Sequence, residues 1–442
     1  MKVKALSRSS ADYVRERSQD IHKVQRNLDP SIHPFEQGRE YVRALNSVKL
    51  ERLFAKPFVG SLNGHIDGVY SMMKHPQQLS SIISGSGDGE IRIWNLTEQS
   101  TTWKVRAHSG IVNGVSAGRR QDQFLSCSTD KTVKIWQPSE SDSEAIQTYI
   151  GQYAFTGLSH HRSDALFATS GHSIDLWDET RSDPIQTFAW GADSYQSVKF
   201  NQVETNILAS CGSDRTIVLY DLRTNKPLSK VVMALKTNAI AWNPIEAYTF
   251  ATANEDHNSY VFDMRNMTSA HNVLKDHVSA VMDIDYSPTG QEIVTGSYDR
   301  SVRVFDARKG HSNDMYHTKR MQRVFCVQFS MDSKFVLSGS DDGNIRLWKA
   351  HASEKLGIKD RRERTKLEYS GKLKERFGHL KEIKRIDRHR NIPQDIKRAD
   401  RTKKEMLQAR RVKDDRRRKH SSKEDASKHV AERSKSIIGV AK

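Results

Sequence analysis

The sequence predicts an all-β repeat protein, and three observations lead to that prediction. An aromatic residue closes a similar stretch seven times, at Trp94, Trp136, Trp177, Tyr220, Phe262, Phe305 and Trp348. The gaps are 42, 41, 43, 42, 43 and 43 residues, and so regular a period indicates repeated supersecondary units. Each aromatic ends an alternating stretch such as Val133-Lys134-Ile135-Trp136, which is typical of a strand. A polar turn and a second apolar run precede it, so each unit is predicted to be built from hairpins.

The units resemble the WD repeat, in which each repeat supplies four strands of a β-propeller blade. In that pattern a His opens the unit, a Ser or Thr precedes the aromatic by ten positions, and an Asp precedes it by six. Three units keep these residues: His65, Ser84, Asp88 and Trp94; His108, Ser126, Asp130 and Trp136; and His277, Thr295 and Asp299 before Phe305. The resemblance implies a seven-bladed WD-repeat β-propeller. The third unit, residues 168–177, is one residue short at its turn and lacks the Asp, so its blade is expected to be the least rigid.

The recurring His, Ser and Asp side chains are interpreted as structural. Buried together, carboxylate, imidazole, hydroxyl and indole groups satisfy one another in a hydrogen-bonded chain. A catalytic triad would occur once, whereas this set recurs, and no nucleophile elbow accompanies it. The three cysteines are far apart and the histidines lack metal-ligand spacing. We therefore expect no enzyme activity, no catalytic residues, no metal, no cofactor and no small-molecule substrate.

The charge of the chain is concentrated after the last repeat. Residues 349–442 hold 32 Lys and Arg against 15 Asp and Glu, so they account for the whole formal net charge of +17. The organisation predicted is an extended N-terminal arm at 1–48, a propeller at 49–349, a basic helical extension at 350–420 and a disordered tail at 421–442. Within the propeller, a strand at about 49–59 is expected to complete blade seven and close the ring. A short helix is expected at 39–45. No apolar run is long enough to span a membrane, and no secretory signal pattern is present.

The basic extension is predicted to form two helices. An amphipathic helix whose apolar stripe needs a partner is marked by Leu367, Leu373, Phe377, Leu380, Ile383 and Ile386. A second helix runs from 395 to about 420. Clustered cations favour phosphate backbones, and RNA is preferred because no groove-reading motif for DNA is present. The candidate RNA-binding residues are Lys384, Arg385, Arg388, Arg390, Lys397, Arg398, Arg401, Lys403, Lys404, Arg410, Arg411, Lys413, Arg416, Arg417, Arg418 and Lys419. Two alternatives stay open: a nuclear import signal at 416–419 and a merely solvated helix.

Three units carry Asp-x-Arg after the closing aromatic position. The pairs are Asp221 and Arg223, Asp263 and Arg265, and Asp306 and Arg308. This pattern resembles the motif by which some WD-repeat proteins dock on the adaptor of cullin-RING ubiquitin ligases. The alternative is that each Arg pairs locally with its own Asp.

The whole chain, to about residue 418, resembles the suppressor-of-fibrillarin WD-repeat family. The likeness rests on Asn27-Leu28-Asp29-Pro30, on Arg39-Glu40-Tyr41-Val42-Arg43-Ala44-Leu45-Asn46, on Tyr316-His317-Thr318-Lys319-Arg320 and on Ala352-Ser353-Glu354-Lys355-Leu356-Gly357. The resemblance implies a nucleolar assembly factor of the small-subunit processome that works on pre-ribosomal RNA. Its partners would be that RNA, small nucleolar ribonucleoprotein and other processome proteins. Animal members are also described as substrate receptors of a cullin-RING ligase.

Overall fold

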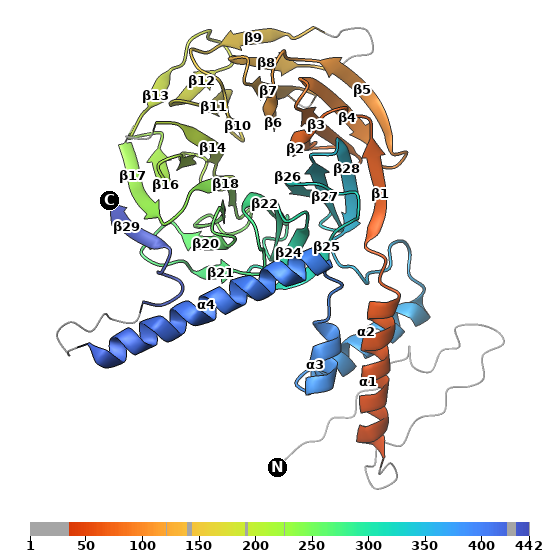
Figure 1. Cartoon of the computed structure of the whole chain (residues 1–442). Helices are drawn as coiled ribbons and strands as arrows, with labels where there is room; N and C mark the ends of the chain where they lie inside the picture. The colour runs from red at the N-terminus through yellow and green to blue at the C-terminus, as the bar shows by residue number, and fades with distance from the viewer. Residues whose placement is uncertain are drawn as a thin grey trace, which may run out of the picture. The chain divides into compact units, whose positions relative to one another are not determined.

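Seven antiparallel sheets form in the residues that the computed structural model describes, which are 35–120, 122–138, 144–190, 193–224, 226–421 and 430–441. Each sheet is one blade, and the inner strands surround the middle of a ring (Figure 1). The predicted seven-bladed propeller is therefore confirmed. Side chains of its strands alternate between the two neighbouring blades, so each sheet buries apolar residues on both faces.

The blades are numbered from the first complete one. Blades one to three contain β2 (Val69–Lys74), β3 (Ser81–Ser86), β4 (Glu90–Asn95) and β5 (Ser100–Arg106); β6 (Val112–Ala117), β7 (Phe124–Ser128), β8 (Thr132–Trp136) and β9 (Gln147–Ile150); and β10 (Gly157–His160), β11 (Leu166–Ser170), β12 (Ile174–Asp178) and β13 (Gln186–Phe188). Blades four and five contain β14 (Tyr195–Phe200), β15 (Ile207–Gly212), β16 (Thr216–Asp221) and β17 (Lys226–Met233); and β18 (Thr237–Trp242), β19 (Thr249–Asn254), β20 (Ser259–Asp263) and β21 (Asn272–Leu274). Blade six contains β22 (Val281–Tyr286), β23 (Glu292–Ser297), β24 (Val302–Asp306) and β25 (Ser312–Tyr316).

Blade seven joins the two ends of the repeat region. Three of its strands, β26 (Val324–Phe329), β27 (Phe335–Ser340) and β28 (Asn344–Lys349), follow blade six in sequence, and the outer strand is β1 (Phe58–Asn63). β1 pairs antiparallel with β28, with Leu62 opposite Ile345. Closure by an N-terminal strand is thus confirmed, and it leaves no unpaired edge on β28.

The predicted position of that closing strand was wrong at its start. Residues 49–53, expected as strand, belong to helix α1 (Glu36–Leu53), and the strand begins only at Phe58. The short helix predicted at 39–45 is confirmed, but it is part of the longer α1, so residues 36–48 as a whole are helical and not an extended arm. Residues 1–34 of the predicted arm lie outside the described residues. The reason is burial: Ala44 and Val48 lie four residues apart on one helix face and are fully covered.

The chain divides into two compact units, one made of residues 1–54 and 356–389 and the other of residues 55–355 and 390–442. In the first unit α1 packs with α2 (Arg361–Phe377) and α3 (Lys381–Asp387), whose residues Leu373 and Ile383 cover Ala44 and Val48. The single amphipathic helix predicted here is therefore two helices, separated at 378–380, and its apolar stripe finds its partner in α1. Ion pairs between Lys374 and Glu51 and between Arg376 and Glu40 flank this core.

The second unit contains the propeller together with α4 (Gln394–His420) and a short strand β29 (Ile437–Ala441). β29 pairs antiparallel with β17 and makes blade four five-stranded. The prediction that 421–442 is disordered is wrong for this segment, because Ile437 and Val440 pack against the blade core. Residues 422–429 lie outside the described residues. No helix in the described ranges is long and apolar enough to cross a membrane.

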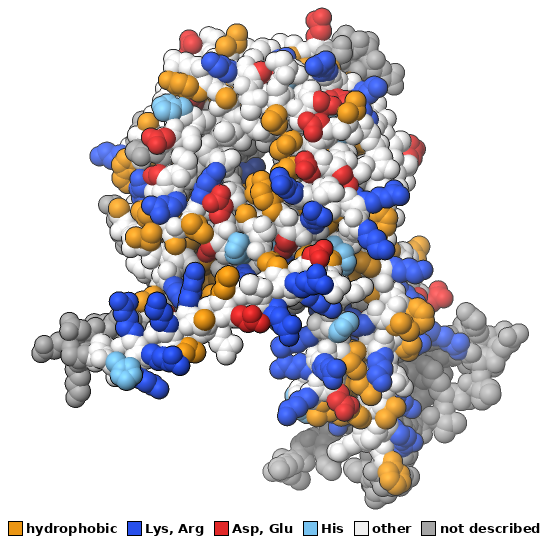
Figure 2. Space-filling view, viewed as in Figure 1, with side chains coloured by type: hydrophobic (Ala, Val, Ile, Leu, Met, Phe, Trp, Pro, Cys, Tyr) orange, Lys and Arg blue, Asp and Glu red, His pale blue; other side chains and the backbone are white. Residues whose placement is uncertain are grey.

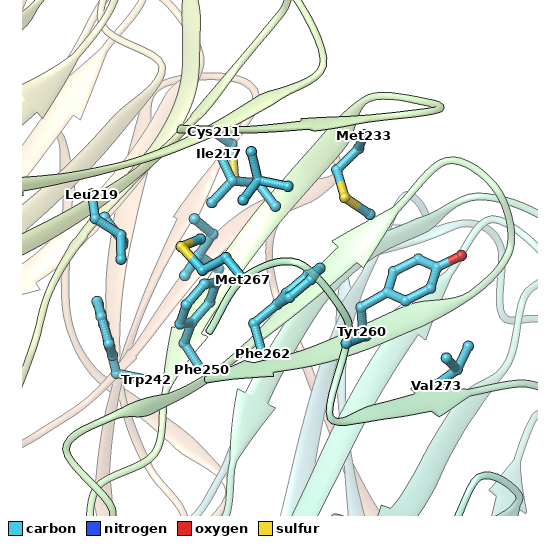
Figure 3. Packing of buried hydrophobic residues seen from close by; sticks show 14 residues of the cluster. Cys211, Ile217, Leu219, Met233, Trp242, Phe250, Tyr260, Phe262, Met267 and Val273 are labelled. Carbon is cyan, nitrogen blue, oxygen red and sulfur yellow. The ribbon is translucent and has the colours of Figure 1, made fainter. Parts of the chain in front are cut away.

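Apolar side chains fill the space between adjacent blades. Figure 3 shows one such cluster, in which Cys211 and Met233 of blade four face Trp242, Phe250 and Phe262 of blade five. All three cysteines of the chain are buried, where they pack as small core residues.

Polar side chains in and beside the inner strands add a second kind of link between blades. At each of the seven junctions one such side chain forms a hydrogen bond with the backbone of a neighbouring blade. These links join Ser71 to Val112, Asn113 to Phe155, Thr156 to Tyr195, Trp242 to Lys199, Asn238 to Val281, Asp283 to Val327 and Cys326 to Val69. The last link closes the circle between blade seven and blade one.

Candidate nucleic-acid and protein docking surfaces

Blade two contains the complete hydrogen-bonded set around a buried histidine, and blade six contains the same set without the indole, because its closing aromatic is Phe305. His108 Nε2 lies 2.8 Å from Ser126 Oγ and its Nδ1 lies 2.9 Å from Asp130. The Trp136 indole N–H donates to the same serine oxygen at 2.8 Å. Because Ser126 accepts from the indole, its own O–H donates to Nε2, which leaves the imidazole proton on Nδ1 facing the carboxylate.

The histidine of blade six is held in the same way. His277 Nδ1 lies 2.9 Å from Asp299, and Nε2 lies 2.7 Å from Thr295 Oγ1. Burial lowers the pKa of His277 despite the neighbouring carboxylate, so the ring is neutral near pH 7. Burial would raise the pKa of Asp299, but the charge and hydrogen bonds of its partners, His277 first, lower it overall.

Blade one departs from this arrangement. His65 Nε2 lies 2.7 Å from Ser84 Oγ, which also accepts the Trp94 indole N–H at 2.8 Å, but His65 Nδ1 is buried without a partner in the described residues. Burial and the Arg92 guanidinium lower the His65 pKa to about 4. His65, Asp88 and Glu90 lie close enough to share a cation, yet Arg92 already supplies positive charge there, 2.9 Å from Glu90.

Two other blades replace part of the set. In blade three the Trp177 indole donates to Thr169 Oγ1 at 2.9 Å, so the hydroxyl lies eight residues before the aromatic. The turn is therefore two residues short, where one was predicted. In blade seven Trp348 donates to Ser338 at 2.9 Å, and Arg346 pairs with Asp342 where other blades use a histidine. These groups satisfy one another inside the sheets, which is a structural role.

Helix α4 is anchored to the propeller by its first half. Ile396 is buried, and the Lys403 ammonium donates to the His277 carbonyl oxygen at 2.7 Å. Burial lowers the pKa of Lys403. Just before the helix, Arg390 lies 3.5 Å from Asp314 of β25. Figure 1 shows α4 running along blades five and six of the ring. Lys403 and Arg390, both predicted to bind RNA, are therefore committed to the propeller.

The segment after α4 returns to the ring and fixes the second half of the helix. Glu432 pairs with Arg411 of α4 and with Lys275 of the propeller. The Ser436 hydroxyl forms a hydrogen bond with Tyr260, and the Ala234 amide donates to the Ser436 carbonyl. Sequence reasoning missed these contacts, and its one available signal was the β-branched pair Ile437 and Ile438 followed by Val440.

The remaining cations of α4 fall into two groups. Arg401, Lys404 and Arg418 pair with acidic side chains three or four residues away on the helix itself. The others are exposed and form no ion pair with the described residues: Lys397, Arg398, Arg410, Lys413, Arg416, Arg417 and Lys419. Figure 2 shows Lys and Arg side chains gathered along α4. Lys384, Arg385 and Arg388, also predicted to bind RNA, lie on and beside α3 in the helical unit.

The three Asp-x-Arg motifs form exposed corners at the ends of β16, β20 and β24. Arg265 pairs with Asp263 at 2.8 Å and its guanidinium lies 3.9 Å from the centre of the Tyr248 ring. Arg223 approaches Asp221 at 3.5 Å, while Asp306 pairs with Lys309 at 3.0 Å instead of with the side chain of Arg308. The side chains of Arg223 and Arg265 remain 74% and 63% exposed, so local pairing and an outward-facing guanidinium coexist.

Seven blades, with serine or threonine bound to the closing tryptophan in four of the described sheets, define a WD-repeat β-propeller scaffold. The family described as "WD domain, G-beta repeat" matches residues 56–95, 99–137, 269–306 and 312–349. A solved structure of the WD40 β-propeller domain of Doa1 has the same fold, with a TM-score of 0.58 at 19% identity, covering 67% of this chain and 97% of that one.

The C-terminal region narrows the family further. Residues 350–437 match the Sof1-like domain. The chain is similar to Protein SOF1 of Saccharomyces cerevisiae, with 50% identity over 468 residues covering 99% of this chain and 95% of that protein. It is also similar to the DDB1- and CUL4-associated factor 13 of Xenopus laevis (51% identity; 95% and 96% covered) and of Homo sapiens (50% identity; 100% of both chains covered). The chain belongs to this Sof1-type WD-repeat family.

Proposed function

We propose that this chain is a non-enzymatic scaffold of the small-subunit processome, in the nucleolus, in which α4 binds pre-ribosomal RNA. The observation that carries the proposal is the row of exposed cations on α4 that no carboxylate in the described residues neutralises. The helix is held by Lys403 and Glu432, so these charges are presented at fixed positions. Fixed cations bind a polyphosphate with a smaller cost in conformational entropy than a mobile tail does.

Five cations form the C-terminal part of this row: Arg410, Lys413, Arg416, Arg417 and Lys419. The acidic residues on the same turns are fewer, and Asp415 is already paired with Arg418. The last turn of a helix also favours cations through the helix dipole, so part of this cluster stabilises α4 itself. The positive charge of these five residues that exceeds the nearby negative charge is available to bind phosphate. Small nucleolar ribonucleoprotein and other processome proteins would then bind the blades.

The test replaces these five residues by glutamine and measures binding to a single-stranded pre-ribosomal RNA fragment across a salt series. Each cation withdrawn from a phosphate is expected to lower the slope of log K against log[salt] by about 0.7, so the slope of the five-fold variant falls by up to about 3.5. A matched control changes five exposed propeller cations to glutamine: Lys104, Arg119, Arg120, Lys319 and Arg320. Equal slopes for both variants would refute the role of α4.

Point variants are preferable to deleting residues 393–442. Such a deletion also removes Lys403 from the His277 carbonyl and β29 from the edge of β17. A loss of RNA binding would then be indistinguishable from damage to blades four to six.

A second candidate function is that of substrate receptor for a cullin-RING ubiquitin ligase. It is favoured by the exposure of Arg223 and Arg265 and by relatives whose name associates them with DDB1 and CUL4. We expect that changing Arg223, Arg265 and Arg308 to alanine abolishes co-purification of the ligase adaptor while RNA binding is retained. The control changes Arg119, Arg120 and Arg320, which are also exposed. If both triple variants retain the adaptor, docking through these motifs is excluded.

A further inference from the structure

One rim of the ring carries a cluster of aromatic rings that belongs to none of the blade cores. Tyr70 of β2 stacks on Phe325 of β26, with ring centres 4.5 Å apart and planes 13° apart. Tyr298, in the turn after β23, meets Phe325 edge-on at 6.0 Å and is 36% exposed. The three rings therefore come from blades one, seven and six, and all are partly open to solvent.

The pairing registers explain why these residues meet. Tyr70 and Phe325 follow the first residues of their strands, which pair with the last residues of β3 and β27: Val69 opposite Ser86, and Val324 opposite Ser340. Both rings consequently lie beside the turns that connect the second and third strands of their blades. β2 and β26 are inner strands, so the cluster lies next to the middle of the ring (Figure 1).

Two carboxylates flank the stacked rings. Asp67 and the Tyr70 ring both lie beside Gly87: a Cβ atom added to this glycine would be 2.4 Å from Asp67 Oδ2 and 3.0 Å from the ring. In the same way Asp341 and the Phe325 ring both lie beside Gly68, where an added Cβ atom would be 3.3 Å from Asp341 Oδ1 and 3.5 Å from the ring. Both aspartates are exposed, and neither forms an ion pair within the described residues. Burial first, and then the negative charges of Asp67 and Asp341, raise the pKa of the Tyr70 hydroxyl.

The chain itself shows what such a surface attracts. The Arg323 guanidinium lies over the Tyr298 ring, 5.3 Å from its centre. Aromatic faces attract cations, and an arginine side chain can stack on a ring while donating to a carboxylate. The stacked pair of Tyr70 and Phe325, with two unneutralised carboxylates beside it, offers aromatic rings together with negative charge to a cation from outside.

We propose that Tyr70, Tyr298 and Phe325, together with Asp67 and Asp341, form a docking site for an arginine-bearing segment of a partner protein. Charge complementarity selects this occupant. Nucleobases also stack on aromatic rings, but Asp67 and Asp341 would repel the phosphates that accompany them. The site is separate from the cations of α4 and from the Asp-x-Arg corners, so it does not depend on either proposed function.

The test measures binding of the full chain to acetyl-Gly-Arg-Gly-amide by saturation-transfer NMR, with the citrulline peptide as its uncharged counterpart. We expect the arginine peptide to bind and the citrulline peptide to bind at least about tenfold more weakly. Changing Asp67 and Asp341 to asparagine should weaken arginine binding about tenfold, or ~1.4 kcal/mol. The control changes Asp183 to asparagine and Glu204 to glutamine, two exposed acids on other turns, and should leave binding unchanged.

Several outcomes would overturn the proposal. They are equal binding of the two peptides, no binding of the arginine peptide, or equal effects of the two double variants. Tighter binding of oligouridine than of the arginine peptide, abolished on changing Phe325 to leucine, would assign the surface to RNA instead. The asparagine variants alter only exposed side chains, so an unchanged thermal unfolding midpoint distinguishes loss of the site from loss of the fold.

Discussion

The serine or threonine hydroxyl in the second strand of a blade forms hydrogen bonds with more side chains in some blades than in others. Ser126 serves both His108 and Trp136, whereas Ser338 serves Trp348 alone. Both serines are completely buried. The number of buried partners that would be left without a hydrogen bond therefore differs at two otherwise equivalent positions.

We predict that Ser126→Ala lowers the free energy of unfolding by about 3 kcal/mol and Ser338→Ala by about 1.5 kcal/mol, because each stranded polar group costs ~1–3 kcal/mol. Urea unfolding of the two variants and the unchanged chain measures the difference. Equal effects would mean that the His108 imidazole finds another partner when the serine hydroxyl is removed.

The histidine of blade one makes stability depend on pH. His65 has a pKa of about 4 in the folded chain and about 6.5 when unfolded. Between these values the unfolded chain binds a proton that the folded chain does not, so the contribution of His65 is complete above pH 6.5 and disappears as the pH falls towards 4.

We expect acidification from about pH 7 to about pH 5 to cost ~2 kcal/mol more in the unchanged chain than in a His65→Gln variant. Glutamine keeps a polar contact for Ser84 and does not titrate. The measurement is the free energy of unfolding of both proteins at the two pH values. A parallel decrease would show that other groups, such as His108 and His277, account for the acid sensitivity.

At the scale of elements, α1 shows how a distant partner overrides a local pattern. The sequence predicts a strand at about 49–59, yet residues up to Leu53 are helical because Ala44 and Val48 are covered by Leu373 and Ile383, which lie far away in the sequence. The helix therefore depends on α2 and α3 for its stability, as short helices generally depend on their packing.

Replacing Val48 by aspartate should unfold this helical unit, because it places an unpaired charge among apolar side chains at a cost of several kcal/mol, roughly 3–5. Limited trypsin digestion should then cut within 361–387, while the propeller remains resistant. Leu50→Asp is the matched control, since Leu50 is 53% exposed on the same helix. Cleavage of both variants at the same rate would contradict this account.

At the scale of the whole molecule, the ring is closed by one short strand. β1 supplies Leu62, which is 1% exposed and packs in a cluster with Val69 and Trp94 of blade one and Leu337 and Ile345 of blade seven. The same junction contains the hydrogen bond from Cys326 to the Val69 carbonyl. Loss of β1 would therefore expose the β28 edge and open the ring at the junction of blades seven and one. In the closed ring each blade packs against a neighbour on both sides.

We predict that Leu62→Asp lowers the unfolding temperature of the entire propeller in one transition, because an opened ring loses support at each junction in turn. The neighbouring Asn63→Asp, on an exposed position of the same strand, should leave the transition in place. Differential scanning calorimetry distinguishes the two. A separate early transition in the Leu62 variant, with the rest unchanged, would show that the blades unfold independently.

The repeat period, the strand alternation and the buried hydrogen-bonding residues are local patterns, and they sufficed to predict seven blades and closure by an N-terminal strand. The same reading of the sequence located the basic excess in residues 349–442. Local patterns were insufficient wherever an element is stabilised by a segment far along the chain. The extent of α1, the β29 strand on blade four, and the commitment of Lys403 and Glu432 to the propeller each depend on such contacts.

The surface formed by Tyr70, Tyr298 and Phe325 also depends on contacts between distant parts of the chain. Its residues lie in three different repeats and meet only when the ring closes. The repeat pattern can be recognised in the sequence of each unit because every blade must bury apolar side chains on both of its faces. Contacts between units, between the ring and its appendages, and at composite surfaces arise from the folded geometry, where residues without any shared sequence pattern become neighbours.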